Sequence, residues 1–161
     1  MFKKKSDYPF LKEFEENWIE IKSEYEAAKE RLIDWPQNEI YNEGWKTFAI
    51  FEWPSGRELI GGSICPVLKR LIKSYVPSHG AVGFSRLGPG TVIEPHSGFD
   101  GDFLRMHLAL QVPKGDCALR CNKEKIKWKE GKAFVFDDRL EHEAWNRTHN
   151  ERVVLIVDFV P

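Results

Sequence analysis

From Gly80 onward the chain consists of short apolar runs separated by turns that contain glycine or proline. Many short strands with turn signals between them are typical of a β-sandwich or a β-barrel. The runs that we expect to form strands lie at about 81–87, 103–112, 117–121, 133–137 and 152–159. The half of the chain from about residue 80 to residue 161 is therefore predicted to be β-rich.

The first half, from about residue 8 to residue 75, has helical periodicity instead. Apolar residues recur at steps of three and four within residues 8–34, which predicts a helix with one face packed on a sheet: Phe10, Phe14, Trp18, Ile21 and Tyr25. A strand is predicted over 44–53 and a second helix over 65–75. We interpret residues 1–161 as one α+β domain with its N-terminal helices packed outside the β-rich half.

The composition argues against several classes of partner. The formal net charge of the 161 residues is −1, so the chain has no bulk attraction to nucleic acid or to anionic membranes. The basic N-terminus is not followed by the apolar segment of a signal peptide, and no run approaches the roughly 18 apolar residues of a membrane span. We expect a cytoplasmic protein with reduced cysteines and with neither a nucleic-acid nor a membrane partner.

One predicted strand, over 104–110, has two chemically different faces. Side chains alternate between the faces of a strand. The even positions are uniformly apolar: Leu104, Met106, Leu108 and Leu110. Arg105 and His107 share the opposite face. If that face met bulk water, the strand would be an ordinary amphipathic one, whereas inside a barrel the polar pair would mark a ligand pocket.

Two histidines and an arginine are the candidates for chemistry. His96 and His142 lie 46 residues apart, and two imidazoles held together by a β-scaffold can bind a divalent metal. This spacing alone is a weak signal. Arg152 begins an almost wholly apolar run, where a buried guanidinium needs an anion. That anion could be a ligand carboxylate or a structural partner such as Asp137 or Asp138.

Several motifs in fixed order resemble one known family. They are Pro-Gly-Thr-x-x-x-Pro-His-Ser-Gly (89–98), Leu-Arg-Met-His-Leu-x-Leu (104–110), Trp-x-x-Gly-Lys (128–132), Phe-Asp-Asp-x-x-x-His-Glu-x-Trp (136–145) and Arg-Val-Val-Leu-Ile-Val-Asp (152–158). Together with Gly44-Trp45, Cys65-Pro66 and Phe84-Ser85, these blocks resemble the aspartyl/asparaginyl β-hydroxylase family.

The resemblance implies a double-stranded β-helix, a jelly-roll or cupin-like core, that binds Fe(II) and uses 2-oxoglutarate and O2 as cosubstrates. The matching positions assign the metal to His96 and His142. Arg152 and Ser85 match groups that hold the distal carboxylate of 2-oxoglutarate. Further cosubstrate contacts are implied for Trp45, Arg105 and His107, and we count Arg105 with the two histidines as catalytic.

Gly98 departs from the usual ligand pattern. Most oxygenases of this type have an acidic ligand two residues after the first histidine, and this chain has glycine there, as the resembled family does. Water is expected in the vacant position. Asp100 or Asp102 could swing in as a third ligand, and a glycine could also leave room for a halide, as in radical halogenases.

The implied activity is hydroxylation of an unactivated carbon, most naturally the β-carbon of an aspartyl or asparaginyl group in a small molecule, peptide or protein. Arg86, Arg120 and Arg139 are loose candidates for gripping a substrate carboxylate. Three alternatives stay open: a radical halogenase that uses the position at Gly98, a non-catalytic jelly-roll module for binding or sensing, and a zinc hydrolase, which would need a third protein ligand.

Overall fold

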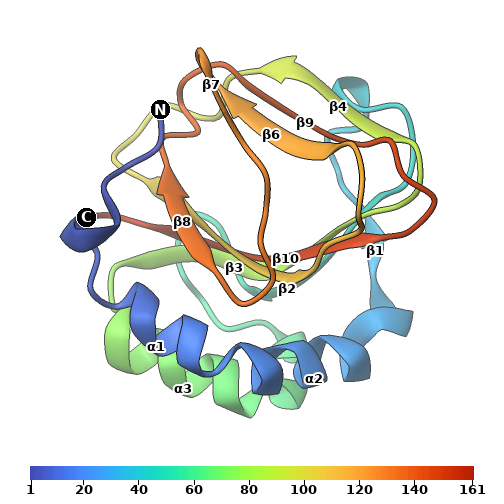
Figure 1. Cartoon of the computed structure of the whole chain (residues 1–161). Helices are drawn as coiled ribbons and strands as arrows, with labels where there is room; N and C mark the ends of the chain where they lie inside the picture. The colour runs from blue at the N-terminus through green and yellow to red at the C-terminus, as the bar shows by residue number, and fades with distance from the viewer.

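Two antiparallel β-sheets face each other and three helices cover the outer side of the larger sheet (Figure 1). The computed structural model describes residues 1–161. The larger sheet has the order β1 (Ile33–Asp34), β2 (Trp45–Phe51), β3 (His79–Leu87), β10 (Arg152–Phe159), β5 (Leu104–Gln111) and β8 (Ala133–Phe136). The smaller sheet has the order β4 (Thr91–His96), β9 (His142–Asn146), β6 (Cys117–Cys121) and β7 (Glu124–Ile126).

The helices are α1 (Leu11–Glu16), α2 (Trp18–Ala28) and α3 (Pro66–Tyr75), and the short 3-10 turns are η1 (Lys5–Asp7), η2 (Lys29–Arg31), η3 (Asn38–Ile40) and η4 (Ile60–Ile64). The prediction of one continuous helix over 8–34 is wrong at Asn17, where the backbone leaves the helical region. The side-chain amide of Asn17 donates a hydrogen bond to the backbone carbonyl of Glu13 at 2.8 Å. Such side-chain bonds compete with the backbone hydrogen bonds of a helix. The helices are too short or too polar for any of them to cross a membrane.

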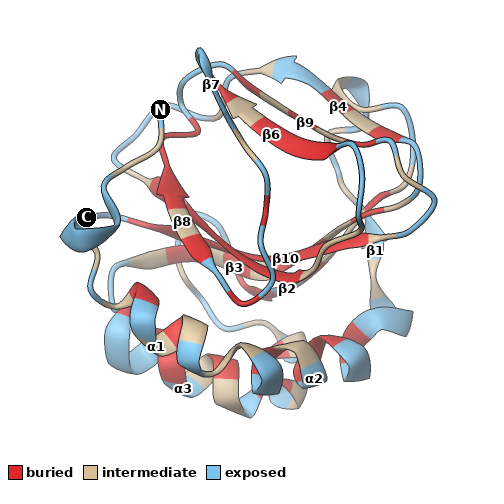
Figure 2. Ribbon diagram, viewed as in Figure 1, coloured by how far each residue is buried: buried red, intermediate tan, exposed pale blue.

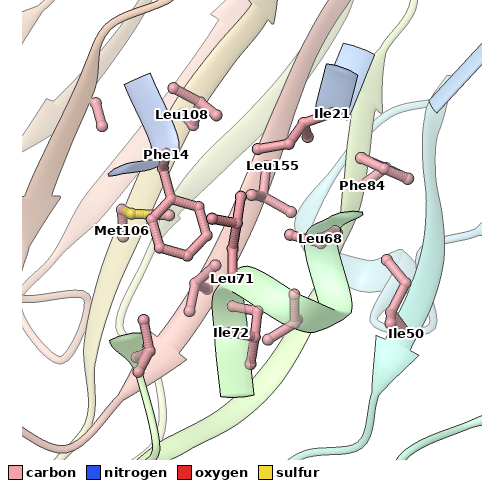
Figure 3. Close-up of a cluster of buried hydrophobic side chains, with 14 of the residues drawn as sticks. Phe14, Ile21, Ile50, Leu68, Leu71, Ile72, Phe84, Met106, Leu108 and Leu155 are labelled. Atoms are coloured by element: carbon pink, nitrogen blue, oxygen red, sulfur yellow. The ribbon is translucent and has the colours of Figure 1, made fainter. Parts of the chain in front are cut away.

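The larger sheet separates two apolar layers, and β10 faces both. Its odd positions, among them Val153 and Leu155, pack against the helices, while Val154 and Ile156 face the smaller sheet. Buried residues accordingly line the sheet-facing sides of the helices and the strands of the larger sheet (Figure 2). In the helix-side layer, side chains from all three helices meet side chains from β5 (Figure 3): Phe14, Ile21, Leu68, Leu71, Ile72, Met106 and Leu108.

Most of the predicted segments are confirmed within about two residues at their ends: α3, β2, β3, β5, β6, β8 and β10. The strands that the hydrophobic pattern missed include β4 and β9 of the smaller sheet. The inward side of β9 consists of His142, Ala144 and Asn146, of which only Ala144 is apolar. A strand whose buried face is mostly polar has no alternating hydrophobic signal.

Glu24 of α2 ties two of the helices together. Its buried carboxylate accepts hydrogen bonds from the backbone N–H groups of Val67 at 2.9 Å and Leu68 at 2.8 Å, in the first turn of α3. These N–H groups have no partner within their own helix, and the positive end of the helix dipole favours a carboxylate there.

We predict that Glu24→Ala lowers the free energy of unfolding by about 1–3 kcal/mol, because it leaves one buried and one partly buried N–H group without an acceptor. Chemical denaturation would measure the loss. Glu20→Ala is the matched control, since Glu20 is exposed on the same helix and should change stability by less than about 0.5 kcal/mol. Equal losses in the two variants would contradict the capping role of Glu24.

Candidate active site

The two candidate metal-binding histidines lie directly opposite each other in the smaller sheet. His96 is the last residue of β4, His142 is the first residue of β9, and the strand register pairs them. Their ring centroids are 4.3 Å apart. Two imidazoles that are 46 residues apart in the sequence are thus brought within reach of one metal ion by antiparallel pairing.

Both rings are held in an orientation that leaves Nε2 available for a metal. Nδ1 of His96 bonds to the carbonyl of Glu94 at 2.7 Å, and Nδ1 of His142 bonds to the carbonyl of Leu140 at 2.8 Å. A carbonyl only accepts, so each Nδ1 donates, and in the neutral ring Nε2 carries the free lone pair. Burial lowers the pKa of His142 to about 3, which keeps this ring neutral. The donor set fits a divalent metal.

No third side chain completes the ligand set. No cluster of three or more histidine, cysteine or acidic side chains is placed to hold a metal. A Cβ at position 98 would lie 2.8 Å from the carbonyl oxygen of Asp138 and 2.9 Å from its Oδ2. Asp138 therefore fills the side of Gly98 that we expected to be open. Asp100 and Asp102 are exposed and line neither cavity described below.

Two cavities meet at the histidines. An inner cavity of about 30 Å³ lies between the sheets, and an outer cavity of about 180 Å³ shares the imidazole pair with it. The residues that line both cavities are Trp45, His96, Arg105 and His142. The polar groups that line only the inner cavity are Ser85, His107 and Arg152, among apolar walls from both sheets.

Arg152, the first residue of β10, is a buried cation that has no anionic partner. It is 2% exposed, and its Nη2 donates to Ser85 Oγ at 3.2 Å and more weakly to the Ser85 carbonyl at 3.4 Å. Its Nε has no hydrogen-bond partner. The guanidinium lies 4.6 Å from the centre of the Trp128 ring. Burial lowers the pKa of Arg152 to about 10.

The structural partners that we considered for Arg152 are engaged elsewhere. Asp137 pairs with Arg139, and Asp138 pairs with Arg105. A buried, unpaired charge is costly, and a bidentate donor with a free N–H suits a carboxylate. The inner cavity is thus built around a positive charge that lacks its anion.

Ser85 and Trp45 form a hydrogen-bonded pair beside this arginine. Ser85 Oγ accepts hydrogen bonds from Trp45 Nε1 at 3.0 Å and from Arg152 Nη2 at 3.2 Å. A hydroxyl oxygen has two acceptor positions, so the hydrogen of Ser85 stays free for another acceptor. Trp45 is held in place by Trp35, whose ring stacks on it at 4.1 Å. Ser85 can therefore donate to an anion that binds Arg152.

His107 adds a neutral donor to the same cavity. It is buried, and its Nδ1 accepts a hydrogen bond from Trp128 Nε1 at 3.2 Å. Burial is the main reason that the pKa of His107 is well below its usual value, and the positive charges of Arg152 and Arg105 lower it further. In a neutral ring with Nδ1 as acceptor, the hydrogen is on Nε2.

Arg105 lies on the inward face with His107, as the alternation in β5 predicted for a barrel interior. Its guanidinium forms a two-bond pair with Asp158, with Nε to Oδ1 at 2.7 Å and Nη2 to Oδ2 at 2.9 Å. Asp138 approaches the same Nη2 at 3.4 Å. Arg105 is thus already compensated by two carboxylates, and its contact with a cosubstrate stays a prediction.

The sequence reasoning missed some residues of the site. Asp158 is the one acid among the even positions of β10. A buried carboxylate needs a cation as its partner, so the sequence could have pointed to a neighbouring arginine. The outer cavity is lined by aromatic side chains that no pattern singled out: Trp35, Trp53, Phe99 and Phe103. The loose candidates Arg86, Arg120 and Arg139 line neither cavity and pair with surface acids or with Asp137.

The fold belongs to the double-stranded β-helix class. Among solved structures, a prolyl-4-hydroxylase from Pseudomonas putida is similar with a TM-score of 0.62 at 15% identity, over 90% of this chain and 86% of that one. A predicted oxalate decarboxylase from Thermotoga maritima is similar with a TM-score of 0.51 at 13% identity, over 81% and 90% of the two chains. At these identities the likeness shows the fold alone.

Sequence comparison identifies the family. The family described as "Aspartyl/Asparaginyl beta-hydroxylase" matches residues 15–161, and the chain belongs to it. The human aspartyl/asparaginyl beta-hydroxylase is 33% identical over 92% of this chain and 20% of its own length. The ornithine lipid ester-linked acyl 2-hydroxylase of Rhizobium tropici is 33% identical over 95% of this chain and 58% of its own length. The chain thus spans less than two thirds of these relatives.

We predict that Arg152→Met raises the free energy of unfolding of the ligand-free protein by about 1 kcal/mol or more, because it removes an unpaired buried charge. Saturating 2-oxoglutarate should stabilise the wild type by about 2.7 kcal/mol at 100 times its Kd and leave this variant unchanged. Chemical denaturation measures both effects. Arg86→Met is the control, since Arg86 has a carboxylate partner in Glu151 and should show no gain.

A second prediction concerns His107 and pH. The folded protein resists protonation of this ring, whereas the unfolded chain takes up the proton below a pKa of about 6.5. His107 therefore costs no stability above pH ~6.5. Below that pH the free energy of unfolding falls as the pH falls, with a slope that approaches about 1.4 kcal/mol per pH unit.

His107→Asn, whose side-chain oxygen can still accept from Trp128, should remove about that much from the slope of unfolding free energy against pH. His142, with its own lowered pKa, keeps its part of the slope. His149→Asn changes an exposed histidine and should retain the wild-type slope. An unchanged slope in His107→Asn would mean that His107 is protonated in the folded protein.

Proposed function

We propose that this protein is an Fe(II)- and 2-oxoglutarate-dependent dioxygenase that hydroxylates an unactivated carbon. The observation that carries the proposal is the unpaired, buried guanidinium of Arg152 in a cavity that the imidazoles of His96 and His142 also line. This arrangement supplies a carboxylate site and a metal site in the lining of one small space. Membership in a hydroxylase family supports the same reading.

The histidine pair fits Fe(II). Imidazole nitrogen is a suitable ligand for this metal, and both Nε2 atoms are free. When bound, the iron with 2-oxoglutarate and O2 would supply the oxidising power for an unactivated C–H bond. With two protein ligands, the remaining metal positions fall to the cosubstrate and to water.

The residues of the inner cavity would bind and orient the cosubstrate. Arg152 offers its free Nε–H to the distal carboxylate, and Ser85 adds its hydroxyl hydrogen. His107 contributes an Nε2–H donor from the same wall. The apolar walls exclude water, so these few donors act at a low dielectric constant, where they bind a carboxylate more strongly.

The alternatives fit the site less well. A binding or sensing module would need the inner cavity but not two histidines with free Nε2 atoms. A zinc hydrolase would need a third protein ligand, and none is placed. For a halogenase, the space beside Gly98 is filled by Asp138.

The relatives are named for different substrates. One is named for aspartyl and asparaginyl groups, and another for the acyl group of ornithine lipid. The expectation of an aspartyl-like substrate stays a prediction, as does the cytoplasmic location. The chain covers only part of each relative, so neither name transfers directly.

We predict that His96→Ala and His142→Ala each lower Fe(II)-dependent succinate formation from 2-oxoglutarate by at least about 100-fold, because each removes one of two protein ligands. Protein purified without oxygen would be mixed with Fe(II), 2-oxoglutarate and O2, and succinate would be quantified.

His149→Ala, an exposed histidine away from both cavities, should behave as the wild type does. Full activity in either of the first two variants would refute the metal site. Tight binding of 2-oxoglutarate without succinate under any condition would instead indicate a sensing module.

A further inference from the structure

Trp128 contacts two of the polar groups that line only the inner cavity, His107 and Arg152. It lies between β7 and β8 and is 4% exposed. Its Nε1 donates a hydrogen bond to Nδ1 of His107 at 3.2 Å, and the two rings lie within 17° of a common plane. Its ring face lies 4.6 Å from the guanidinium of Arg152. One indole thus contacts His107 with its edge and Arg152 with its face.

The segment that carries Trp128 is fixed to β5 by backbone hydrogen bonds. The carbonyl of Ala109 accepts from the N–H of Gly131 at 2.9 Å, and the N–H of Ala109 donates to the carbonyl of Lys132 at 3.1 Å. Ala109 lies two residues after His107, on the same face of β5. The indole and the imidazole are therefore held side by side by the pairing of their own backbone segments.

The hydrogen bond from Trp128 decides which role His107 has in the cavity. A neutral imidazole has one donor and one acceptor nitrogen, and its partners decide which is which. An indole N–H only donates, so Nδ1 of His107 is the acceptor. A hydrogen on Nδ1 would place two N–H groups against each other. The hydrogen is thus on Nε2, which makes no hydrogen bond within the protein and can donate into the cavity.

The polar groups that line only the inner cavity are consequently all donors. The Ser85 hydroxyl accepts from Trp45 and Arg152 and keeps its hydrogen, and Arg152 keeps a free Nε–H. The cavity measures about 30 Å³, so one small group inside it meets all of these donors. The two oxygens of a carboxylate can accept from three donors. An amide has one oxygen, which accepts from at most two, so its NH2 group would face the third donor.

We propose that Trp128 is a positioning residue that sets the specificity of the inner cavity: it fixes His107 as a donor, so that the cavity accepts a carboxylate and rejects an amide. Without the indole N–H, His107 can carry its hydrogen on Nδ1, and Nε2 can then accept from an amide. Donors left without an acceptor lower the affinity for an analogue strongly. The inference rests on the proposed dioxygenase function, because it concerns the carboxylate of 2-oxoglutarate that enters this cavity.

The first measurement locates the hydrogen on His107. In metal-free protein whose histidines carry the heavy nitrogen isotope, NMR chemical shifts distinguish a protonated ring nitrogen from a bare one. His107→Asn identifies the signals of His107 by their loss. We expect a bare Nδ1 and a protonated Nε2 in the wild type, and a mixture of both neutral forms in Trp128→Phe. Phenylalanine keeps an aromatic face for Arg152 and removes the N–H donor.

The second measurement compares two probes that differ in the group entering the inner cavity. N-oxalylglycine has the metal-binding end and the distal carboxylate of 2-oxoglutarate, and N-oxalylglycinamide has an amide in place of that carboxylate. Titration calorimetry with Fe(II) and without oxygen gives the Kd of each probe for the full chain. We expect the wild type to bind the carboxylate probe at least about 100-fold more tightly than the amide. Trp128→Phe should bind the amide about tenfold more tightly than the wild type does, and the carboxylate within about threefold.

Trp145→Phe is the matched control. The Nε1 of Trp145 also donates a hydrogen bond, to Asp116 at 2.6 Å, but Trp145 lines neither cavity. This variant should retain the wild-type ratio of the two Kd values. A purely structural role of Trp128 would weaken the binding of both probes alike, so the ratio distinguishes the two roles. Thermal unfolding verifies that both variants are folded.

The outcomes separate this inference from the proposed function. A hydrogen on Nδ1 of His107 in the wild type overturns the role of Trp128, and that result depends on no variant. An unchanged ratio of Kd values in folded Trp128→Phe overturns it as well. If the wild type binds neither probe with Fe(II), the dioxygenase proposal falls and the selection of a carboxylate falls with it. The nitrogen shifts would then still show whether Trp128 fixes His107.

Discussion

The arrangement of the inner cavity depends on one unpaired positive charge. Arg152 begins a strand that is buried on both faces, where a guanidinium without an anion is unfavourable for stability. Its neighbours offset the cost only in part, through weak bonds to Ser85 and the face of Trp128. The chain thus accepts a less stable ligand-free state, and an anionic ligand in the cavity would recover the difference.

The larger sheet separates two kinds of packing, so the unpaired charge of Arg152 lies apart from the main apolar core. On its outer side, the helices and the sheet form a mainly apolar layer, which also contains the carboxylate of Glu24. On its inner side, polar groups stand among apolar ones around the cavities. β5 and β10 contribute one face to each side, so the same two strands supply core packing outside and the groups Arg105, His107 and Arg152 inside.

The two arginines of the site differ in how far their charge is compensated. Asp158 and Asp138 neutralise Arg105, which lines both cavities, whereas the charge of Arg152 in the inner cavity stays free.

Local patterns in the chain were sufficient for α3, for most strands and for the shared face of Arg105 and His107, because periodicity depends only on neighbouring residues. They missed the break at Asn17 and the end of α2 at Ala28, and they left open whether the face of Arg105 and His107 meets water or a cavity. The need of Arg152 for an anion could also be inferred from its apolar surroundings in the chain. The resemblance to a family pointed to His96 and His142, although β9 was missed because its inward face is mostly polar.

Other features depend on contacts between distant segments, which no local pattern contains. Pairing of β4 with β9 brings the two histidines to 4.3 Å. Pairing of β5 with β10 commits Arg105 to Asp158, and the loop that holds Asp138 closes the space at Gly98. Which carboxylates reach Arg105 is set by cross-strand register for Asp158 and by the loop after β8 for Asp138, not by residue identity alone.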